Sequence, residues 1–390
     1  MLAVTGVGMV SPLGLDAISS CAAARAGIQR IMMGDDVFVD DLDGKAVPVA
    51  VHRVPRISAG LFGFTRLLQL GQFALYDLLR TTPAPREDRV GMILIVDGGS
   101  YQEALARRRR QEAEEATADN ARAHEPPAEL ANDDVFGALR TLIVNDLLST
   151  LVKRVGLEVA PQLRVTLAAT TTGLVPALRQ AEEWLSLNVC DRCIVGAIDS
   201  LIDPPTLAAL DDLGLLRTPN RAVGISPGEA ACFLALESPR QPRSRPAPIR
   251  AFLDCFSTSS ESAHPLLVET SPHGGGLRAA IAETLSRLPD GGRTTGLVVA
   301  NMNGDPYRAM SWGSGAISTD SPVRIGSLPI WIPALHFGDV GAATGPLSVA
   351  MLVRGWDRQY APSANALVCL MDDMGARSVL SARAPKAVAA

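Results

Sequence analysis

Apolar residues recur with helical spacing in the middle of the chain, directly after a short strand-like segment. Between Leu174 and Leu185 they stand three or four positions apart, which is the pattern of an amphipathic helix. The residues from Arg164 onward predict a short strand before this helix, and Cys193–Asp199 predicts a buried strand after it. The pattern therefore predicts a strand, a tight turn, a helix and a parallel strand, with Thr170 in the turn. That position suits a nucleophile, because the positive end of a helix stabilises an anion.

The second half of the sequence repeats this organisation. Thr295–Ala300 and Ile330–Ala334 predict apolar strands, and residues 338–345 form another turn of small residues that enters a helix. Two similar halves rich in strand-helix-strand units predict one pseudo-symmetric α/β fold. A Pro-, Ser- and Arg-rich stretch separates them. We therefore divide the chain into a first half at 1–238, a linker at 239–248, a second half at 249–381 and a flexible tail at 382–390.

A charged segment interrupts the first half at residues 101–134. Four consecutive arginines, Arg107 to Arg110, are followed by several glutamates, and two pairs of opposite charge, Arg108–Glu112 and Arg110–Glu114, stand four positions apart. A solvated helix and loop is the simplest interpretation, and an excursion that binds a partner is the alternative. Because the segment has little apolar periodicity, we expect it to be dispensable for folding.

Composition and charge exclude several classes of function. Of the 390 residues 47% are hydrophobic and 20% are charged, and the net charge is −5 at pH 7, which indicates a soluble globular protein without an electrostatic reason to bind nucleic acid. No apolar run reaches the roughly 18 residues of a membrane span. Six scattered cysteines are typical of buried thiols in a reducing compartment, so we expect a cytoplasmic protein. No pattern predicts a cofactor or a metal site.

Two local motifs invite a catalytic interpretation, and both have a simpler one. Gly224–Gly228 matches the nucleophile elbow GxSxG, but Pro227 lacks the N–H that an oxyanion hole would need, so a turn is expected. Cys190 and Cys193 form a lone CxxC without a second pair for zinc, so two half-buried thiols are expected.

The histidines offer one candidate for catalysis. His336 precedes the turn at residues 338–345, so it can face the same cavity as Thr170, although a structural role is the simpler interpretation. Three others stand in polar, loop-like contexts and are expected at the surface: His52, His124 and His264.

Short motifs along the whole chain stand in one recognisable order. They are Val4–Gly14, the central turn and helix, Ile194–Ser200, Pro227–Ala231 and Gly341–Ala343. In this order and spacing the sequence resembles the β-ketoacyl synthases, apart from residues 101–134 and the tail. Each motif alone is weak, and the ordered set is specific. The resemblance implies an α/β, thiolase-like αβαβα layered fold made of two pseudo-repeated halves, usually assembled as a dimer.

The resemblance also implies where the catalytic residues would stand, and this chain departs from the family there. The nucleophilic cysteine of the family falls on Thr170, within Ala169–Gly173. The first catalytic histidine falls on Asn301 and the second on Asp339. The glycine- and phenylalanine-rich gate of the family is replaced by Asp372–Gly375.

These departures predict that the condensing chemistry is lost. A cysteine at a helix start ionises near neutral pH, and a threonine hydroxyl does not. Asp339 would place negative charge where condensation needs neutral donors. We therefore expect a protein without condensing activity. The alternative is an acyltransferase of the fatty-acid or polyketide type with altered chemistry through Thr170 or Cys232.

Two kinds of partnership fit a non-catalytic member of this family. One is a chain-length-factor-like role, as a heterodimer with a ketosynthase-like subunit that works beside an acyl carrier protein. The other is a stand-alone accessory, a homodimer of the kind associated with type VI secretion effectors or adaptors, which Asn301–Arg308 and Trp312 favour. In both cases we expect the apolar strand Cys193–Asp199 to lie at a sheet edge that a second subunit covers.

Overall fold

The computed structural model describes residues 1–40, 45–54, 56–83, 88–119, 133–239, 248–261, 273–317 and 321–385. Most of the predicted linker at 239–248 lies outside the described residues, as do the last residues of the predicted tail, His124 and His264. What the sequence predicts for them stays a prediction.

Ten strands form one mixed sheet in the order β10-β9-β11-β12-β8-β1-β7-β6-β4-β5. The first five of these strands along the chain are β1 (Leu2–Val10), β4 (Val90–Val96), β5 (Arg164–Ala168), β6 (Arg192–Ser200) and β7 (Glu229–Glu237). The second five are β8 (Ala251–Ser260), β9 (Leu297–Ala300), β10 (Ile330–Trp331), β11 (Asn365–Met371) and β12 (Ala376–Arg383). A separate hairpin consists of β2 (Met32–Asp40) and β3 (Ala46–Val51).

The two sets of five strands have the same topology. Numbered within its own set, each follows the order 3-2-4-5-1. In each set three neighbouring strands are parallel, and the other two run antiparallel to their neighbours. The first strands of the two sets, β1 and β8, pair with each other and join the halves. The repetition confirms the prediction of two pseudo-repeated halves.

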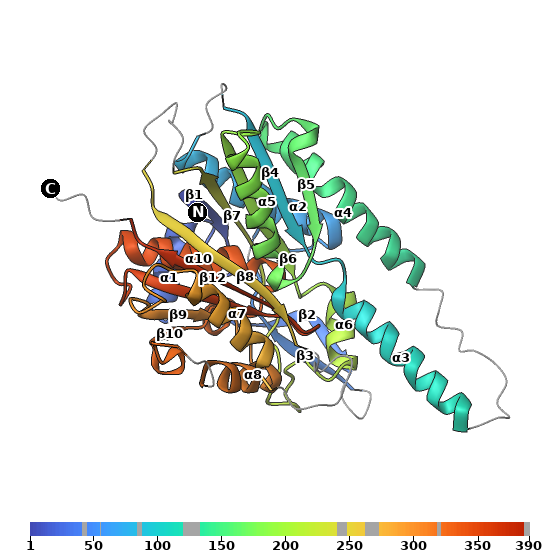
Figure 1. Ribbon diagram of the computed structural model, residues 1–390. Helices are drawn as coiled ribbons and strands as arrows, with labels where there is room; N and C mark the ends of the chain where they lie inside the picture. The colour runs from blue at the N-terminus through green and yellow to red at the C-terminus, as the bar shows by residue number, and fades with distance from the viewer. Residues whose placement is uncertain are drawn as a thin grey trace.

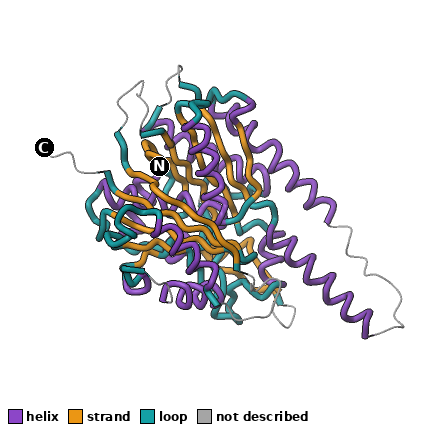
Figure 2. The backbone as a smooth tube through the Cα atoms, in the orientation of Figure 1, coloured by secondary structure: helices purple, strands orange, loops and turns teal. Residues whose placement is uncertain are grey.

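Helices lie on the outer faces of the sheet and between its halves (Figures 1 and 2). The first half packs against α2 (Gly63–Thr81) and α4 (Asp133–Val155), and the second half packs against α7 (Gly275–Ser286). The helix α5 (Leu174–Ser186) contacts strands of both halves, and so does α10 (Thr344–Asp357). These two helices form the central layer, which confirms the predicted αβαβα arrangement.

The described helices also include α1 (Ala17–Arg25), α3 (Ser100–Asp119), α6 (Pro204–Asp212), α8 (Pro306–Ile317) and α9 (Ala334–Phe337). None of the helices in the described part of the chain has both the length and the apolar character needed to cross a lipid bilayer.

The central motif folds as the apolar spacing predicts. A 3-10 turn at Thr171–Gly173 leads into α5 at Leu174, and the apolar stripe of that helix packs into the core. Both β4 and β6 are buried along their whole length, because helices cover the parallel strands on both faces. The turn that carries Thr170 is thus held between a buried sheet and a buried helix.

The sheet edge lies at β5, so the prediction that Cys193–Asp199 forms the edge is wrong. This segment belongs to β6, which lies between β7 and β4, and its apolar character reflects burial inside the sheet. The edge strand β5 pairs with β4, and all five of its residues are at least partly exposed. The opposite edge is the two-residue strand β10.

Two boundaries in the second half also differ from the sequence analysis. The strand predicted to reach Ala334 ends at Trp331, because Pro333 and α9 follow. The strand β12 was not predicted and continues to Arg383, so the tail predicted from residue 382 begins inside the sheet. Ala382 is only 2% exposed, which a frayed terminus would not allow.

Helix α3 projects from the body of the molecule, and the described part of α4 lies beside its base (Figure 1). Tyr101 and Ala104 anchor its first turn in a buried cluster that includes Leu207 and Leu210 of α6. Every residue from Arg107 to Glu114 is exposed. The expectation that the whole segment 101–134 is solvated is therefore wrong for its first turn, and its dispensability for folding stays a prediction.

Candidate functional site

The carboxyl ends of strands from both halves meet at one place. Asp97 follows β4, Thr170 stands two residues after β5, and Asp199 is the second-last residue of β6. From the second half, Asn301 directly follows β9 and Asp372 directly follows β11. All but Asn301 line a cavity of about 20 Å³, which is room for about one water molecule and not for an acyl chain.

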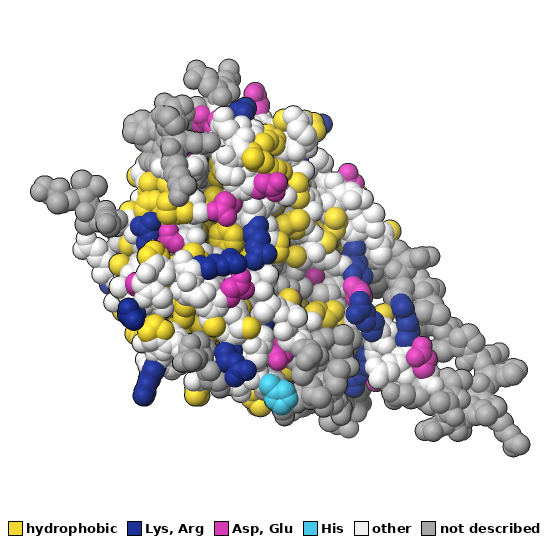
Figure 3. Space-filling model, viewed as in Figure 1, with side chains coloured by type: hydrophobic (Ala, Val, Ile, Leu, Met, Phe, Trp, Pro, Cys, Tyr) yellow, Lys and Arg dark blue, Asp and Glu magenta, His cyan; other side chains and the backbone are white. Residues whose placement is uncertain are grey.

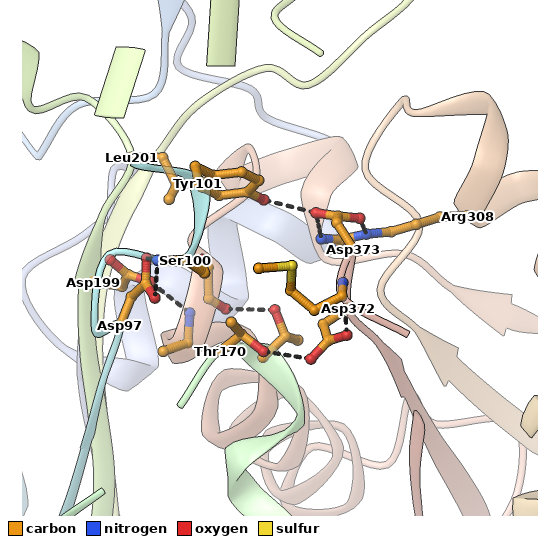
Figure 4. A pocket seen from close by; sticks show the side chains of 13 residues that line it. Asp97, Ser100, Tyr101, Thr170, Asp199, Leu201, Arg308, Asp372 and Asp373 are labelled. Atoms are coloured by element: carbon orange, nitrogen blue, oxygen red, sulfur yellow. Dashed lines mark hydrogen bonds and ion pairs between the residues drawn. The ribbon is translucent and has the colours of Figure 1, made fainter. Parts of the chain in front are cut away.

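Thr170 faces the carboxylate of Asp372 (Figure 4). Its Oγ1 donates to Asp372 Oδ2 at 2.8 Å, and Thr172 Oγ1 donates to the same oxygen at 3.1 Å. Asp372 Oδ1 accepts the backbone N–H of Met374 at 3.0 Å and that of Ala376 at 2.7 Å. The carboxylate thus occupies the helix start, where the dipole of α5 favours an anion, and four donors already engage it.

Asn301 is bound to the backbone at the end of β11. Its Nδ2 donates to the carbonyl of Met371 at 2.7 Å, and its Oδ1 accepts the N–H of Met371 at 2.8 Å. The side chain is 2% exposed. It therefore extends the ladder between β9 and β11 as a backbone amide would, and both ends of the amide take part in this structural pairing.

Arg308 of α8 fills the interior beside Asp339. It is 2% exposed, and its Nε and Nη2 donate to the two carboxylate oxygens of Asp373 at 2.8 and 2.6 Å. Its Nη1 lies 3.4 Å from Asp339 Oδ2. Tyr101 Oη donates to Asp373 at 2.7 Å, and Asn303 Nδ2 donates to Asp339 at 2.5 Å. Arg308 thus pairs with the negative charge that the sequence places at Asp339.

The pKa values in this network follow from burial and charge pairing. Burial alone would raise the pKa of Asp373, but Arg308 and the Tyr101 hydroxyl hold it below its ordinary value. Burial likewise opposes the charge of Arg308, and the two carboxylates keep its pKa well above the ordinary value. Burial and the charge of Asp373 raise the pKa of Tyr101, so its hydroxyl stays a donor.

A second pair of carboxyl groups, Asp97 and Asp199, lies on the opposite wall of the cavity (Figure 4). Asp97 accepts the N–H and the hydroxyl of Ser100, and Asp199 accepts the N–H groups of Ser200 and Ala342, each at 2.7 Å. Burial raises the pKa of Asp97, and burial together with the charge of Asp97 raises that of Asp199 well above its ordinary value. Within the described residues, no His, Cys, Asp and Glu side chains form a group of three or more that could hold a metal ion.

His336 does not reach this cavity. It lies on α9, half-buried, with a hydrogen bond to the backbone of Ile28, and it is absent from the cavity lining. His52, expected at the surface, is instead 3% exposed and bonds to the backbone of His336. Its ring packs against Gly338, which has a φ of +72° and where a side chain would overlap the His52 ring. Burial lowers the pKa of His52 to about 4.

The other candidate nucleophiles lie away from the site. Cys232 is fully buried in β7, and burial raises its thiol pKa well above the ordinary value, so the prediction that it could carry acyl-transfer chemistry is wrong. Cys190 and Cys193 are free thiols that hydrogen-bond to each other and are fully buried rather than half-buried. The backbone carbonyl of Ser226 accepts the N–H of Asp339 at 2.8 Å. This structural contact agrees with the expectation that Gly224–Gly228 is a turn and not a nucleophile elbow.

Sequence reasoning placed Thr170, Asn301 and Asp339 but missed what connects them. The segment Met371–Asp373 contacts all three: directly for Thr170 and Asn301, and through Arg308 for Asp339. The sequence did contain a sign of this connection, because charged residues directly follow predicted strands. The carboxyl ends of parallel strands lie at the same edge of a sheet, so these residues come together there. No such sequence pattern indicated that Tyr101 belongs to the site.

Known proteins resemble this chain in their structures and not in their overall sequences. No family model matches it, and no curated protein sequence matches it. A chain of the complex between a type II polyketide acyl-carrier protein and its ketosynthase is 16% identical over 98% of this chain and 99% of that chain, with a TM-score of 0.74. The ishigamide ketosynthase/chain length factor is 20% identical over 98% and 99% of the two chains, with a TM-score of 0.66. A beta-ketoacyl synthase from Burkholderia phymatum is 15% identical over 99% of each chain, with a TM-score of 0.69. Over its whole length, the chain has the thiolase-like fold of the ketosynthases.

Proposed function

We propose that this protein is a ketosynthase-fold subunit without condensing activity that acts by pairing with a ketosynthase-like chain, either a homologue or a second copy. This proposal rests on the observation that the site is closed. The cavity beside Thr170 has room of about 20 Å³, and the side chains at the three catalytic positions are held by structural hydrogen bonds or an ion pair. A thioester substrate would have to displace Asp372 and Arg308 to reach Thr170.

The partnership rests on the exposed edge of β5. Its five residues are each at least partly exposed, whereas β4 beside it is buried throughout. A regular strand with an open edge invites pairing with another strand. One neighbour in fold is a ketosynthase/chain length factor and another was solved with its acyl-carrier protein. These neighbours favour the chain-length-factor-like role and an acyl carrier protein as a further partner over the secretion-associated role. Because all six cysteines are free, we place the protein in the cytoplasm.

The alternative is an acyltransferase that uses Thr170, and one observation favours it. The 2.8 Å hydrogen bond from Thr170 Oγ1 to Asp372 is the geometry of a nucleophile beside a base. The other hydrogen bonds to Asp372 oppose it, because the hydroxyl of Thr172 and the N–H groups of Met374 and Ala376 hold the carboxylate in a structural role.

The test is the release of carbon dioxide from a malonyl carrier protein, together with the intact mass of the protein after incubation with acyl thioesters. We expect neither carbon dioxide above the level of the Thr170→Ala variant nor an acyl adduct. A decarboxylation rate well above that variant contradicts the proposal. An adduct that Thr170→Ala removes and Thr170→Ser retains establishes the acyltransferase instead.

A further inference from the structure

Cys190 and Cys193 play no part in the proposed function, and the fold brings their sulfur atoms together. Cys193 stands opposite Gly91 where β6 pairs with β4. The Sγ atom of Cys190 lies over the same glycine, 3.4 Å from the point that a Cβ there would occupy. The two thiols hydrogen-bond to each other, and both residues are 0% exposed. The pair is thus a buried dithiol at the start of β6.

The two thiols differ in their chemical environment. Cys190 accepts the S–H of Cys193 and the backbone N–H of Gly91, and these bonds hold the pKa of its thiol below the ordinary value although burial opposes them. Burial raises the pKa of Cys193 well above the ordinary value, and the hydrogen bond that it donates acts in the same direction. Cys190 is therefore the thiol that ionises, and Cys193 is a protonated partner directly beside it.

The loop that carries Cys190 lies beside a surface cavity. This cavity of about 870 Å³ is lined by Val189, the residue before Cys190, and by Arg89. Arg89 holds the loop, since its Nη1 donates to the carbonyl of Asn188 and its Nη2 to Asp191 Oδ1, each at 2.8 Å. The two charged side chains are 50% and 38% exposed, and Figure 3 shows acidic and basic side chains at the surface where β4 begins. Because exposed ion pairs contribute little to stability, the loop can open locally and admit a small solute to Cys190.

We propose that Cys190 and Cys193 form a site of reversible oxidation, at which hydrogen peroxide converts the dithiol into a disulfide. The thiolate of Cys190 attacks one oxygen of the peroxide, the O–O bond breaks, and Cys190 becomes a sulfenic acid while hydroxide leaves. Cys193 loses its proton and attacks the sulfenic sulfur, so that the S–S bond forms and the hydroxyl group leaves with that proton as water.

The electrons and protons of this reaction balance. Two electrons pass from the sulfur atoms to the peroxide, and the hydroxide of the first step takes the proton that Cys190 released, so two water molecules form. A dithiol reductant reverses the change by thiol–disulfide exchange. The other buried thiols should not react, because burial raises the pKa of Cys21 to about 12 and that of Cys232 well above the ordinary value.

Peptide mapping tests the proposal, because trypsin cleaves after Arg192, between the two cysteines. The disulfide therefore joins the peptides 180–192 and 193–217, and mass spectrometry identifies the linked pair. In a folded chain with Cys255→Ser, hydrogen peroxide is added, and the remaining thiols are then alkylated in urea. Most of the two peptides should appear as the linked pair, which dithiothreitol separates again, while Cys21 and Cys232 are recovered alkylated.

Two matched variants assign the roles of the thiols. With Cys193→Ser the reaction should stop at a sulfenic acid on Cys190, which dimedone traps, and with Cys190→Ser dimedone should label neither cysteine position. Circular dichroism checks that both variants fold, and the linked peptides decide the question if either does not. The proposal is overturned if Cys190 and Cys193 stay alkylatable at a peroxide concentration that oxidises the same chain unfolded in urea. It is equally overturned if Cys21 and Cys232 are oxidised as fast, or if dimedone labels Cys193 in the Cys190→Ser variant.

Discussion

Replacement of Arg308 by methionine should be among the most destabilising single changes in this protein. Methionine fills much of the volume of the aliphatic stem but leaves Asp373 and Asp339 buried without their cation. Arg308 and Asp373 are 2% and 4% exposed, so solvent cannot compensate. Removing one partner of a buried ion pair costs about 3–5 kcal/mol. We expect a loss of that size in the free energy of unfolding at neutral pH, measured by urea denaturation followed by circular dichroism.

Two further measurements separate charge from packing. Adding Asp373→Asn and Asp339→Asn to the methionine variant should restore part of the stability, because the uncompensated charges are gone. The contribution of Asp373 to the pH dependence of stability should also change sign. In the unaltered protein the pKa of Asp373 is lowered. Its contribution to stability is therefore present at neutral pH and is lost only when the pH falls through that lowered pKa. In the variant, burial raises the pKa of Asp373, so this carboxyl group should add stability as the pH falls through the raised value. A cost below about 1 kcal/mol, or a further loss on adding the asparagines, refutes the reasoning.

Three other predictions follow from burial and the sheet edge. Because Asp97 and Asp199 have raised pKa values, their contribution to stability should increase as the pH falls through those raised values, and Asp97→Asn should reduce this increase in melting experiments. His52 has a pKa of about 4, so its protonation should cost up to about 3 kcal/mol as the pH falls from 6.5 to 4, a loss that His52→Gln should not show. At the edge of β5, Ala169 donates its N–H inward to Val96, so by alternation Thr166 points its N–H outward. Thr166→Pro should therefore abolish β5-mediated dimers while Thr166→Val keeps them, and a variant dimer of unchanged affinity in light scattering would exclude this interface.

The sequence allowed the fold and the positions of the site to be predicted, because both depend on local patterns. The apolar spacing after Leu174 and the small-residue turn before it define the strand-turn-helix unit with Thr170 at the helix start. The second set of strands repeats the first, and the repeated pattern of apolar segments and small-residue turns indicated this. These features need no knowledge of which strand neighbours which.

What failed depends on pairings distant in sequence. The strand at Cys193–Asp199 is apolar because it is central, and the same composition would suit a covered edge, so only the strand order distinguishes the two. Asp372 lies 202 residues from Thr170 along the chain, and no local pattern shows that its carboxylate replaces an external anion at the helix start. His52 illustrates the same limit, since a polar sequence context concealed a ring that is 3% exposed.

Restoring the family's catalytic residues should not restore catalysis. The triple variant Thr170→Cys, Asn301→His and Asp339→His supplies the cysteine and both histidines of the family. However, the first change removes the hydroxyl that binds Asp372, and the second breaks both hydrogen bonds that hold the end of β11. The variant should therefore be less stable than the unaltered protein, and Arg308 and Asp373 still fill the space that a thioester needs.

We expect no decarboxylation by the triple variant and measurable activity only when Arg308 and Asp373 are also replaced by small residues. Carbon dioxide release from malonyl carrier protein measures both, with melting curves to show that each variant is folded. Activity in the triple variant alone would mean that Met371–Asp373 opens readily. The absence of condensing activity that we propose would then result from the three catalytic positions and not from the closure of the site.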